Sequence, residues 1–350
     1  MGLKEFFSKL YATPTTLPHL IRIHNNNTDV AQQLEGAFIP EQHYFTVSVN
    51  EMFLSSRRKW LREIEPMVVS LSGYIYGEQK IEDPFVVGRS LFKDKSQEIP
   101  QGMLFLDTRV AGTHPYRGDR VTLSLVLCQY TSKDYLASSL KFVEDISGVF
   151  GESMKLLVNN YTNIARVLIN GIDNLLDLKT IQPLFGFREE FGNGPNNEFT
   201  PGYFVLLDSS TKDPDPGKFF VKENRLYYGE DAGTAKPFRD DEYILFNVAR
   251  SEERGDVSLL PVYQSYKKIL EELKTPEVSA AQKDKIKDML RVLNIEMRQS
   301  PDLTAPHAKK LMEKYIREVS DLIAPKFNFG AAFTEEKNDW SILDEKIQAL

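Results

Sequence analysis

Cysteine and histidine are scarce in this chain, which limits the chemistry that it can carry. Its 350 residues include one cysteine, Cys128, and five histidines. A single cysteine excludes an internal disulfide framework and a cysteine-rich zinc site. No two histidines stand at the spacing of HxxxH or HExxH, and metal ligands have to converge from a rigid frame. We therefore expect no structural metal and no cofactor, and we expect Cys128 to be a buried structural residue.

The short motifs of several common enzyme classes are also missing. The sequence contains no G-x-G-x-x-G and no G-x-x-x-x-G-K, so it has neither of these phosphate-binding loops. It contains no G-x-S-x-G, so a hydrolase with a nucleophile elbow has no anchor. We expect no catalytic residue and favour a protein that is not an enzyme. A hydrolase whose site is dispersed over the chain stays open as an alternative.

Long apolar runs and excess positive charge are absent as well. No stretch reaches the roughly 18 apolar residues that span a bilayer, so we expect no transmembrane segment. The first eleven residues carry Lys4, Glu5 and Lys9 and lack a continuous apolar core, so we expect no signal peptide. The net charge of −7 and the pI of about 5.5 argue against broad binding to nucleic acid. These features predict a cytoplasmic protein, for which a bacterium-like cell is the default source.

Alternating hydrophobicity is the main sign of regular structure in the first half of the chain. It predicts strands over 43–53, 66–76, 85–87, 103–110 and 120–130. In the last of these strands one face is strongly apolar and the other is mixed, which is typical of a half-buried antiparallel strand. The mixed face consists of Thr122, Ser124, Val126 and Cys128. The Pro115–Asp119 stretch predicts a wide hairpin that joins strands 103–110 and 120–130.

Apolar stripes of helical period follow the hairpin. They predict helices near 132–150 and 154–178. Strand patterns then return over 184–191, 202–207, 218–222, 225–228 and 242–249, with a tight turn at Glu223–Asn224. Strands on both sides of a helical pair favour one α+β domain with a helical insertion. We predict an antiparallel β-sandwich-like body over residues 1–256, with a two-helix insertion.

The pattern after Gly255 becomes helical and predicts a separate C-terminal part. Helices are expected over 262–273, from Ser279 to Met297 and from Thr304 to Ile323. Ser279 and Gln282 have the spacing of a capping box at the start of the second helix. We therefore predict a helical domain over residues 257–350, which ends in an aromatic tail that begins at Phe327.

Acidic residues are concentrated in the second β-region. Residues 189–256 hold fifteen Asp or Glu against eight Lys or Arg, which equals the net charge of the whole chain. Carboxylates on the loops of a sandwich are able to bind Ca²⁺, and Asp208, Asp213 and Asp215 are the candidate metal ligands. The same Asp-Pro-Asp-Pro-Gly stretch is typical of a plain surface turn, which is the interpretation that we favour.

The order of elements suggests a family. The stretch Pro115-Tyr116-Arg117-Gly118-Asp119, the two predicted helices, the Pro201–Leu207 strand and the Phe219–Tyr228 hairpin follow one another along the chain. Over roughly residues 43–250 the chain thus resembles uncharacterised β-sandwich accessory proteins of bacterial conflict (defence) gene clusters. The resemblance implies a non-enzymatic component of antiviral defence and supplies no catalytic residues.

These patterns lead to one favoured function and two alternatives. We favour a non-enzymatic protein–protein interaction, scaffold or adaptor protein that binds another protein through its C-terminal helices or its aromatic tail. The first alternative is a β-sandwich domain that binds a ligand, Ca²⁺ or a membrane surface. The second is the hydrolase with a dispersed site. Calcium-dependent binding to liposomes would favour the first alternative, and a cleft with a strongly shifted acidic pKa would favour the second.

Overall fold

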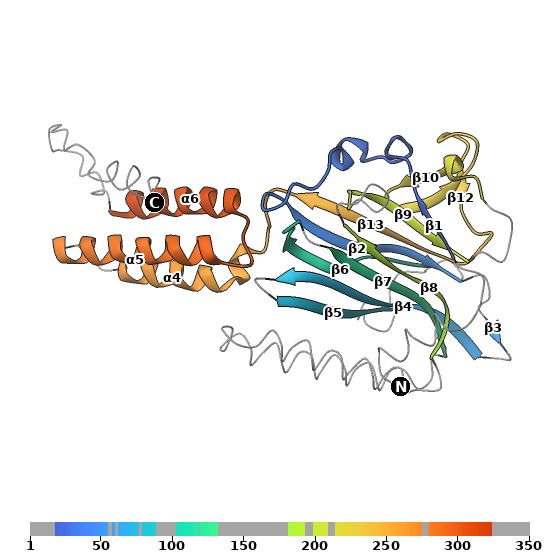
Figure 1. Ribbon diagram of the computed structural model, residues 1–350, viewed down its shortest axis with the longest axis horizontal. Helices are drawn as coiled ribbons and strands as arrows, with labels where there is room; N and C mark the ends of the chain where they lie inside the picture. Colours follow the sequence, from blue (N-terminus) through green and yellow to red (C-terminus); the bar gives the residue numbers. More distant parts are fainter. Residues whose placement is uncertain are drawn as a thin grey trace. The chain divides into compact units, whose positions relative to one another are not determined.

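The computed structural model shows two compact units along the chain. One unit spans Met1–Ser251 and the other spans Glu252–Leu350. The boundary along the chain therefore falls a few residues before the expected one, after Asp256. The ribbon in Figure 1 shows a β-rich first unit and a helical second unit. The structure describes residues 18–54, 58–59, 62–76, 79–88, 103–118, 120–131, 181–192, 199–208, 214–274 and 279–323.

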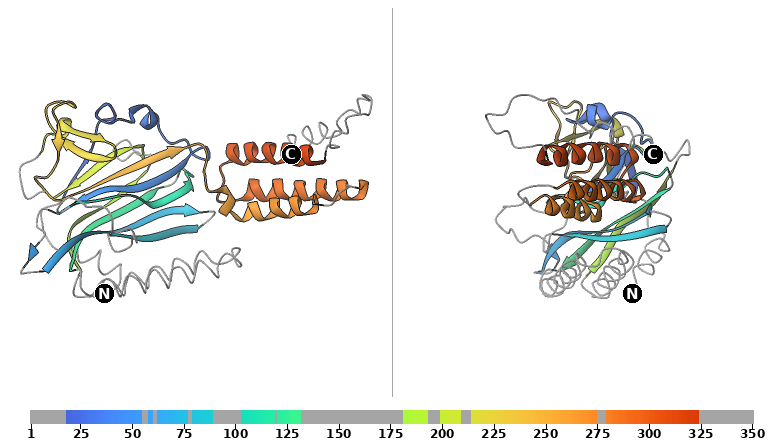
Figure 2. Two further views of the ribbon diagram at one scale, coloured as in Figure 1. Left: turned by 180° about the vertical axis from the view of Figure 1, so that it is seen from behind. Right: turned by 90° about the vertical axis from the view of Figure 1, so that its left-hand side faces the viewer.

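Three antiparallel sheets make up the described part of the first unit (Figures 1 and 2). The β2 sheet has five strands in the order β1 (His19–Arg22), β9 (Gly202–Leu207), β13 (Tyr243–Ser251), β2 (Tyr44–Phe53) and β6 (Met103–Pro115). The β7 sheet contains β3 (Arg58–Lys59), β4 (Arg62–Tyr76), β7 (Val121–Thr131) and β8 (Ile181–Phe191), and β5 (Gln79–Gly88) pairs with β4. The small hairpin sheet contains β10 (Phe219–Lys222), β11 (Arg225–Tyr228) and β12 (Lys236–Pro237).

The main core lies between the β2 sheet and the β7 sheet. Val121, Leu123 and Leu125 of β7 belong to it, and so do alternate residues of β13. The rings of Phe187 on β8 and Phe246 on β13 stack with their centroids 5.6 Å apart, which joins the two sheets directly. Two antiparallel sheets packed through one apolar core form the predicted β-sandwich body.

A second core covers the opposite face of the β2 sheet. Here the hairpin sheet and the 3₁₀ helix η2 (Ala31–Leu34) supply Phe219, Leu226 and Leu34, and β13 supplies Tyr243 and Leu245. Because successive side chains of a strand point to opposite faces, β13 feeds both cores. The β2 sheet is therefore buried on two sides, which explains why all six residues of β9 are buried and why its sequence is apolar without alternation.

The predicted hairpin between 103–110 and 120–130 is wrong. Strand β6 pairs with β2, whereas β7 pairs with β4 and β8 in the other sheet. After β6 the chain stays bound to the segment before β2, because Tyr116 donates from its N–H to the His43 carbonyl and accepts from the Glu41 N–H. The left-handed residue Gly118 then turns the chain, and it crosses to the β7 sheet. The alternation of apolar and polar residues predicted which residues of these strands share a face, but it did not predict which strands pair.

Burial of β7 also differs from the prediction. The strand was expected to be half-buried, yet every residue from Val121 to Cys128 is buried. Its second face carries Thr122, Ser124 and Cys128, whose small side chains bury little polar area. The strand lies between β4 and β8, and central strands are more deeply buried than edge strands. The expected strand at 85–87 is also longer, because β5 includes the polar residues Glu82 and Asp83.

The second unit contains the three predicted helices. They are α4 (Pro261–Glu272), α5 (Ala280–Gln299) and α6 (Ala305–Ile323), and η5 (Val257–Leu259) precedes them. Their apolar stripes form a core of their own, in which the rings of Tyr266 and Tyr315 stack 3.7 Å apart. The Ser279 side chain accepts a hydrogen bond from the Gln282 N–H, as a helix N-cap does. The Gln282 side chain donates to the Glu272 carbonyl.

Together these elements form an α+β fold with an antiparallel sandwich body and a C-terminal helical segment, as predicted. The expected helices near 132–150 and 154–178 and the aromatic tail lie outside the described residues. In the part of the chain that is described, no helix is both long enough and apolar enough to cross a membrane.

Candidate functional site

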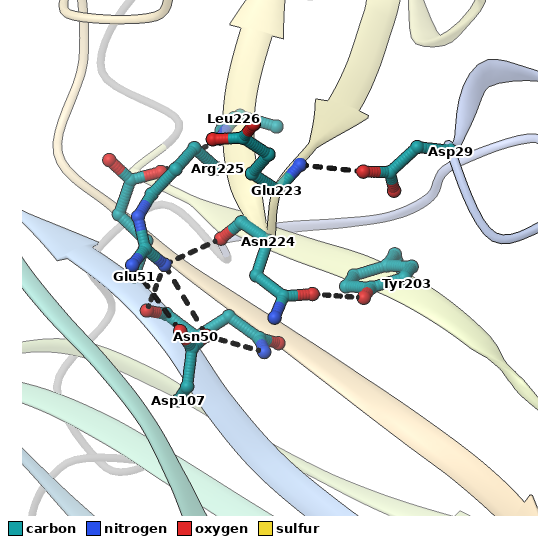
Figure 3. Close-up of polar contacts among 9 residues, drawn as sticks. All are labelled: Asp29, Asn50, Glu51, Asp107, Tyr203, Glu223, Asn224, Arg225 and Leu226. Atoms are coloured by element: carbon teal, nitrogen blue, oxygen red, sulfur yellow. Dashed lines mark hydrogen bonds and ion pairs between the residues drawn. The ribbon is translucent and has the colours of Figure 1, made fainter.

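Irregularities in the neighbouring strands β2 and β6 create a polar cluster on the face of the β2 sheet that the hairpin sheet covers. Opposite β13 the register shifts, so that Val49 and Glu51 have partners while Asn50 is an extra residue. Opposite β2 a second shift falls at Asp107, whose φ is +40°. A bulge inserts an unpaired residue and redirects the side chains around it. These bulges place Asn50, Glu51 and Asp107 next to the hairpin sheet (Figure 3).

The turn of the β10–β11 hairpin supplies the other half of the cluster. Glu223 and Asn224 have φ values of 49° and 61°, which the mirror-image turns of two-residue hairpins require. The Glu223 N–H donates to Asp29 Oδ2 over 2.7 Å. The Tyr203 hydroxyl donates to Asn224 Oδ1 (Figure 3). The tight turn predicted at Glu223–Asn224 is therefore present, and it is bound to the loop before η2 and to β9.

Arg225 joins the hairpin to both bulges. Its Nη1 donates to Asp107 Oδ1 and its Nη2 donates to Asp107 Oδ2, each over 3.3 Å, which is a bidentate arrangement. Nη1 also lies 3.2 Å from the Asn50 carbonyl oxygen. Both charged side chains are partly exposed, so the ion pair adds little stability. Its bidentate geometry does orient the hairpin relative to β6.

Glu51 is the fully buried carboxylate of the cluster. Its side chain is 0% exposed, and its Oε2 accepts a hydrogen bond of 2.7 Å from the Leu226 N–H. Among the described residues Oε1 has no hydrogen-bond partner, and Arg239 Nη1 lies 3.8 Å away. Burial raises the pKa of Glu51 to about 7, although the Leu226 N–H, Arg239 and Tyr243 partly oppose this shift. Near neutral pH the protonated and ionised forms therefore coexist.

Arg239 closes the cluster on the side of β13. Its guanidinium carbon lies 5.5 Å from the centre of the Phe53 ring, in a cation–π arrangement. Its Nη1 donates to the Tyr243 hydroxyl over 3.3 Å. Burial, together with the nearby Glu51 carboxylate, raises the pKa of Tyr243 well above its usual value, so this phenol stays protonated.

The residues singled out in the sequence do not form this cluster. The Asp215 side chain accepts from the Gly217 N–H over 2.9 Å and caps a short 3₁₀ turn, which is the surface-turn role. The Asp208 N–H donates to the Glu242 carbonyl, and Asp213 lies outside the described residues. Within the described ranges, no group of three or more His, Cys, Asp or Glu side chains comes together to hold a metal ion. Calcium binding at these aspartates stays a prediction.

Cys128 is placed as expected. It is free and fully buried in the β7 sheet. Burial raises the pKa of its thiol, which keeps it protonated and unreactive.

Sequence reasoning missed Glu51, Asp107 and Arg225. One signal was available, because the polar pair Asn50–Glu51 interrupts the otherwise apolar strand 43–53. Two adjacent polar residues cannot both face solvent on a regular strand, so they indicate either a bulge or a buried polar site. Nothing in the local sequence points to their partner, because Arg225 lies 175 residues from Asn50.

The helical unit offers a feature of another kind. Val292 and Ile295 of α5 are each 54% exposed, and their spacing places them on one side of the helix. The core-facing side of α5 carries Ile286, Leu290, Leu293 and Met297. Charged residues lie beside the exposed pair, including Asp288 and Arg291, which form an ion pair of 2.7 Å. This α5 patch is apolar at its centre and polar at its margin.

The polar cluster and the α5 patch differ in what they can do. Glu51 is sealed beneath the hairpin sheet, so it offers no open site to a substrate. The α5 patch is accessible, and its centre consists of the apolar side chains of Val292 and Ile295. Comparison of the chain with protein-family models, with curated protein sequences and with solved structures finds no match.

Proposed function

We propose that the protein is a non-enzymatic adaptor that binds another protein through the α5 patch of its helical unit. One observation carries this proposal: the helical unit completes its own apolar core and still exposes Val292 and Ile295 on the opposite side of α5. Following the resemblance to proteins of bacterial conflict clusters, we place the adaptor as an accessory component of a bacterial defence system.

The physical case rests on the distribution of apolar residues around α5. A surface helix normally turns one apolar stripe to the core and polar residues to water. Helix α5 satisfies its core with four buried residues, so the exposed pair contributes nothing to that core. An apolar centre with a charged margin is the anatomy of a protein–protein interface. Single exposed apolar residues are common, but two on one turn of a helix form a small contiguous surface.

The experiment compares tagged full-length protein with a patch variant, Val292→Asp together with Ile295→Asp. Each chain is expressed in its native host, and the proteins that copurify are quantified. The matched control places aspartate at Gln264 and Lys268, which are exposed on α4. Circular dichroism checks that all three chains remain helical to the same degree.

We expect one partner protein to copurify in a fixed ratio with the wild-type chain and the control. With purified components, the patch variant should bind this partner at least tenfold more weakly, which corresponds to about 1.4 kcal/mol. Equal affinity of the patch variant and the wild type would reject the α5 patch. The failure of any partner to copurify with the wild-type chain would count against the adaptor function itself.

A further inference from the structure

We propose that the hairpin sheet acts as a pH-dependent latch: it lies on the β2 sheet in the closed state and lifts away from it in the open state. Glu51 is the group that controls which of the two states is favoured. This inference is independent of the adaptor function. It concerns the contact between β10–β12 and the β2 sheet within the first unit (Figure 3).

The hairpin sheet is attached in a way that permits it to separate. Its strands pair with one another, and in the described part of the chain only the isolated bridge between Thr28 and Val221 joins its ladder to another segment. Lifting the hairpin sheet therefore breaks no strand pairing of the β2 sheet. The hairpin sheet is held on the β2 sheet by apolar contacts in the second core. It is also held by polar contacts, called ties below, to the β2 sheet and to the loop before η2.

Four of these ties converge on the β10–β11 turn. Asp29 binds the Glu223 N–H, Tyr203 binds Asn224, and Asp107 binds Arg225. The fourth tie is Glu51, which binds the Leu226 N–H. The side chains of Asp107 and Arg225 are partly exposed, so they exchange protein contacts for water at small cost. Glu51 is the tie whose side chain is completely buried.

An ionised Glu51 is poorly accommodated when the latch is closed. Its Oε1 accepts no hydrogen bond from the described residues and has Arg239 Nη1 3.8 Å away, and the whole side chain is buried. A buried carboxylate with an unsatisfied oxygen is costly, whereas a buried carboxylic acid is far less so. When the hairpin sheet lifts, Glu51 reaches water and its ionised form is solvated. Closure is therefore coupled to the uptake of a proton.

The charged groups around Glu51 weaken this coupling without cancelling it. Arg225 and the Leu226 N–H face it from β11, Arg239 faces it from the segment before β13, and Tyr243 faces it from β13. All four favour the ionised form. Asp107 on β6 binds the Arg225 guanidinium, which limits the positive charge that Arg225 offers to Glu51.

Burial outweighs these groups and raises the pKa of Glu51 from about 4.5 to about 7. The closed state then binds a proton over a pH range in which the open state has lost it. Closure is favoured as the pH falls through 7, and opening is favoured as it rises. Above about pH 7 both states are ionised, so the preference for the open state stops growing.

Hydrogen exchange of the full-length protein tests the latch directly. Exchange of the hairpin amides, Leu226 above all, is followed between pH 5 and pH 8 and divided by the intrinsic exchange rate at each pH. The opening equilibrium should rise about tenfold per pH unit from about pH 5 to pH 6.5 and level off above about pH 7.5. Amides of α5 in the other unit serve as an internal reference and should show no such profile.

Two variants distinguish control by Glu51 from a general weakening of the contacts between the hairpin sheet and the β2 sheet. Glu51→Gln keeps an oxygen that accepts from the Leu226 N–H but cannot ionise, so its hairpin amides should exchange with a flat pH profile. Asp107→Asn is a matched carboxyl-to-amide change at an exposed member of the cluster. It should exchange faster at every pH and keep the wild-type slope.

A slope that persists in the Glu51→Gln variant would show that another group controls the hairpin and would overturn the proposal. Wild-type protection of the Leu226 amide that is equal at pH 5.5 and pH 8 would overturn it as well. The second result needs no variant, so the proposal remains testable even if Glu51→Gln does not fold.

Discussion

At the scale of single residues, the backbone around Gly112 leaves no room for a side chain. It lies in β6 with a φ of +87°, a region that favours glycine. A Cβ at this position would overlap the Phe45 carbonyl oxygen and would also lie 3.0 Å from the Thr46 Cα, and neither backbone atom is able to move aside. The position therefore excludes every side chain, on grounds of both space and backbone conformation.

We expect Gly112→Ala to lower the free energy of unfolding by more than about 3 kcal/mol. Urea unfolding followed by circular dichroism measures the effect. Gly255→Ala is the matched control, because a Cβ there would meet nothing within 4 Å. The control should change stability by less than about 0.5 kcal/mol. Similar stability of both variants would mean that β6 relaxes around the new methyl group.

Asp83 is a second carboxyl group that the fold holds in an unfavourable place. It lies on β5 opposite Ser72, and Ile81 on the same face packs against the main core. Burial raises its pKa from 3.8 to about 6. Among the described strands β5 pairs with β4 alone, and an inward-pointing charge on an edge strand discourages pairing with other chains. We infer that Asp83 lowers the stability of the fold but prevents other chains from pairing with the edge of the sheet at β5.

The sign of its effect on stability follows from the direction of the shift. Between about pH 4 and pH 6 the folded chain binds a proton that the unfolded chain has lost, so the contribution of Asp83 falls as the pH rises. Asp83→Asn should then raise the free energy of unfolding by about 2 kcal/mol at pH 7.5 and have little effect at pH 4. Asp240→Asn, a change of the same kind at an exposed position, should have little effect at either pH. A stability difference for Asp83→Asn that does not depend on pH would contradict this explanation.

At the scale of elements, the sequence predicts strands and helices better than it predicts their partners. Period-two alternation located β2, β4 and β7, and the stripes after Gly255 located α4, α5 and α6. These signals are local, because each depends on which face of an element is buried. Pairing depends on residues far apart in the chain, so the connection from β6 to β7 was taken for a hairpin although it crosses between sheets.

The polar cluster shows the same limit at the candidate site. The β10–β11 turn was predicted, because Glu223–Asn224 stands between two short β patterns. The bulges at Asn50 and Asp107 were not, because a bulge changes the register of two strands that the sequence does not pair. The significance of Glu51 depends on the hairpin that covers it, and Leu226 is 175 residues away in the chain. Only the break in the apolar pattern of β2 was visible beforehand.

At the scale of the whole molecule, the apolar cores divide along the same line as the two units. The main core and the second core use described residues from Leu20 to Val248, whereas the helical core uses residues from Leu260 to Ile323. The ion pairs that begin the helical unit also stay within it, because Arg254 binds Asp256 and Asp302. No described residue belongs to cores of both units. Each unit therefore has what it needs to close a core alone.

Truncation after Ser251 tests this division. The fragment keeps both β cores and the complete β13 strand, so we expect it to be soluble and to unfold cooperatively. The loss of stability should stay under about 1 kcal/mol, which corresponds to a decrease of about 2–4 °C in Tm for a unit of this size. Thermal unfolding followed by circular dichroism measures it against the β transition of the full chain. The fragment should also fail to bind the partner that recognises the α5 patch. A fragment that aggregates or melts far lower would show instead that the helices complete the core of the β-body, and would reject the separation of the two units.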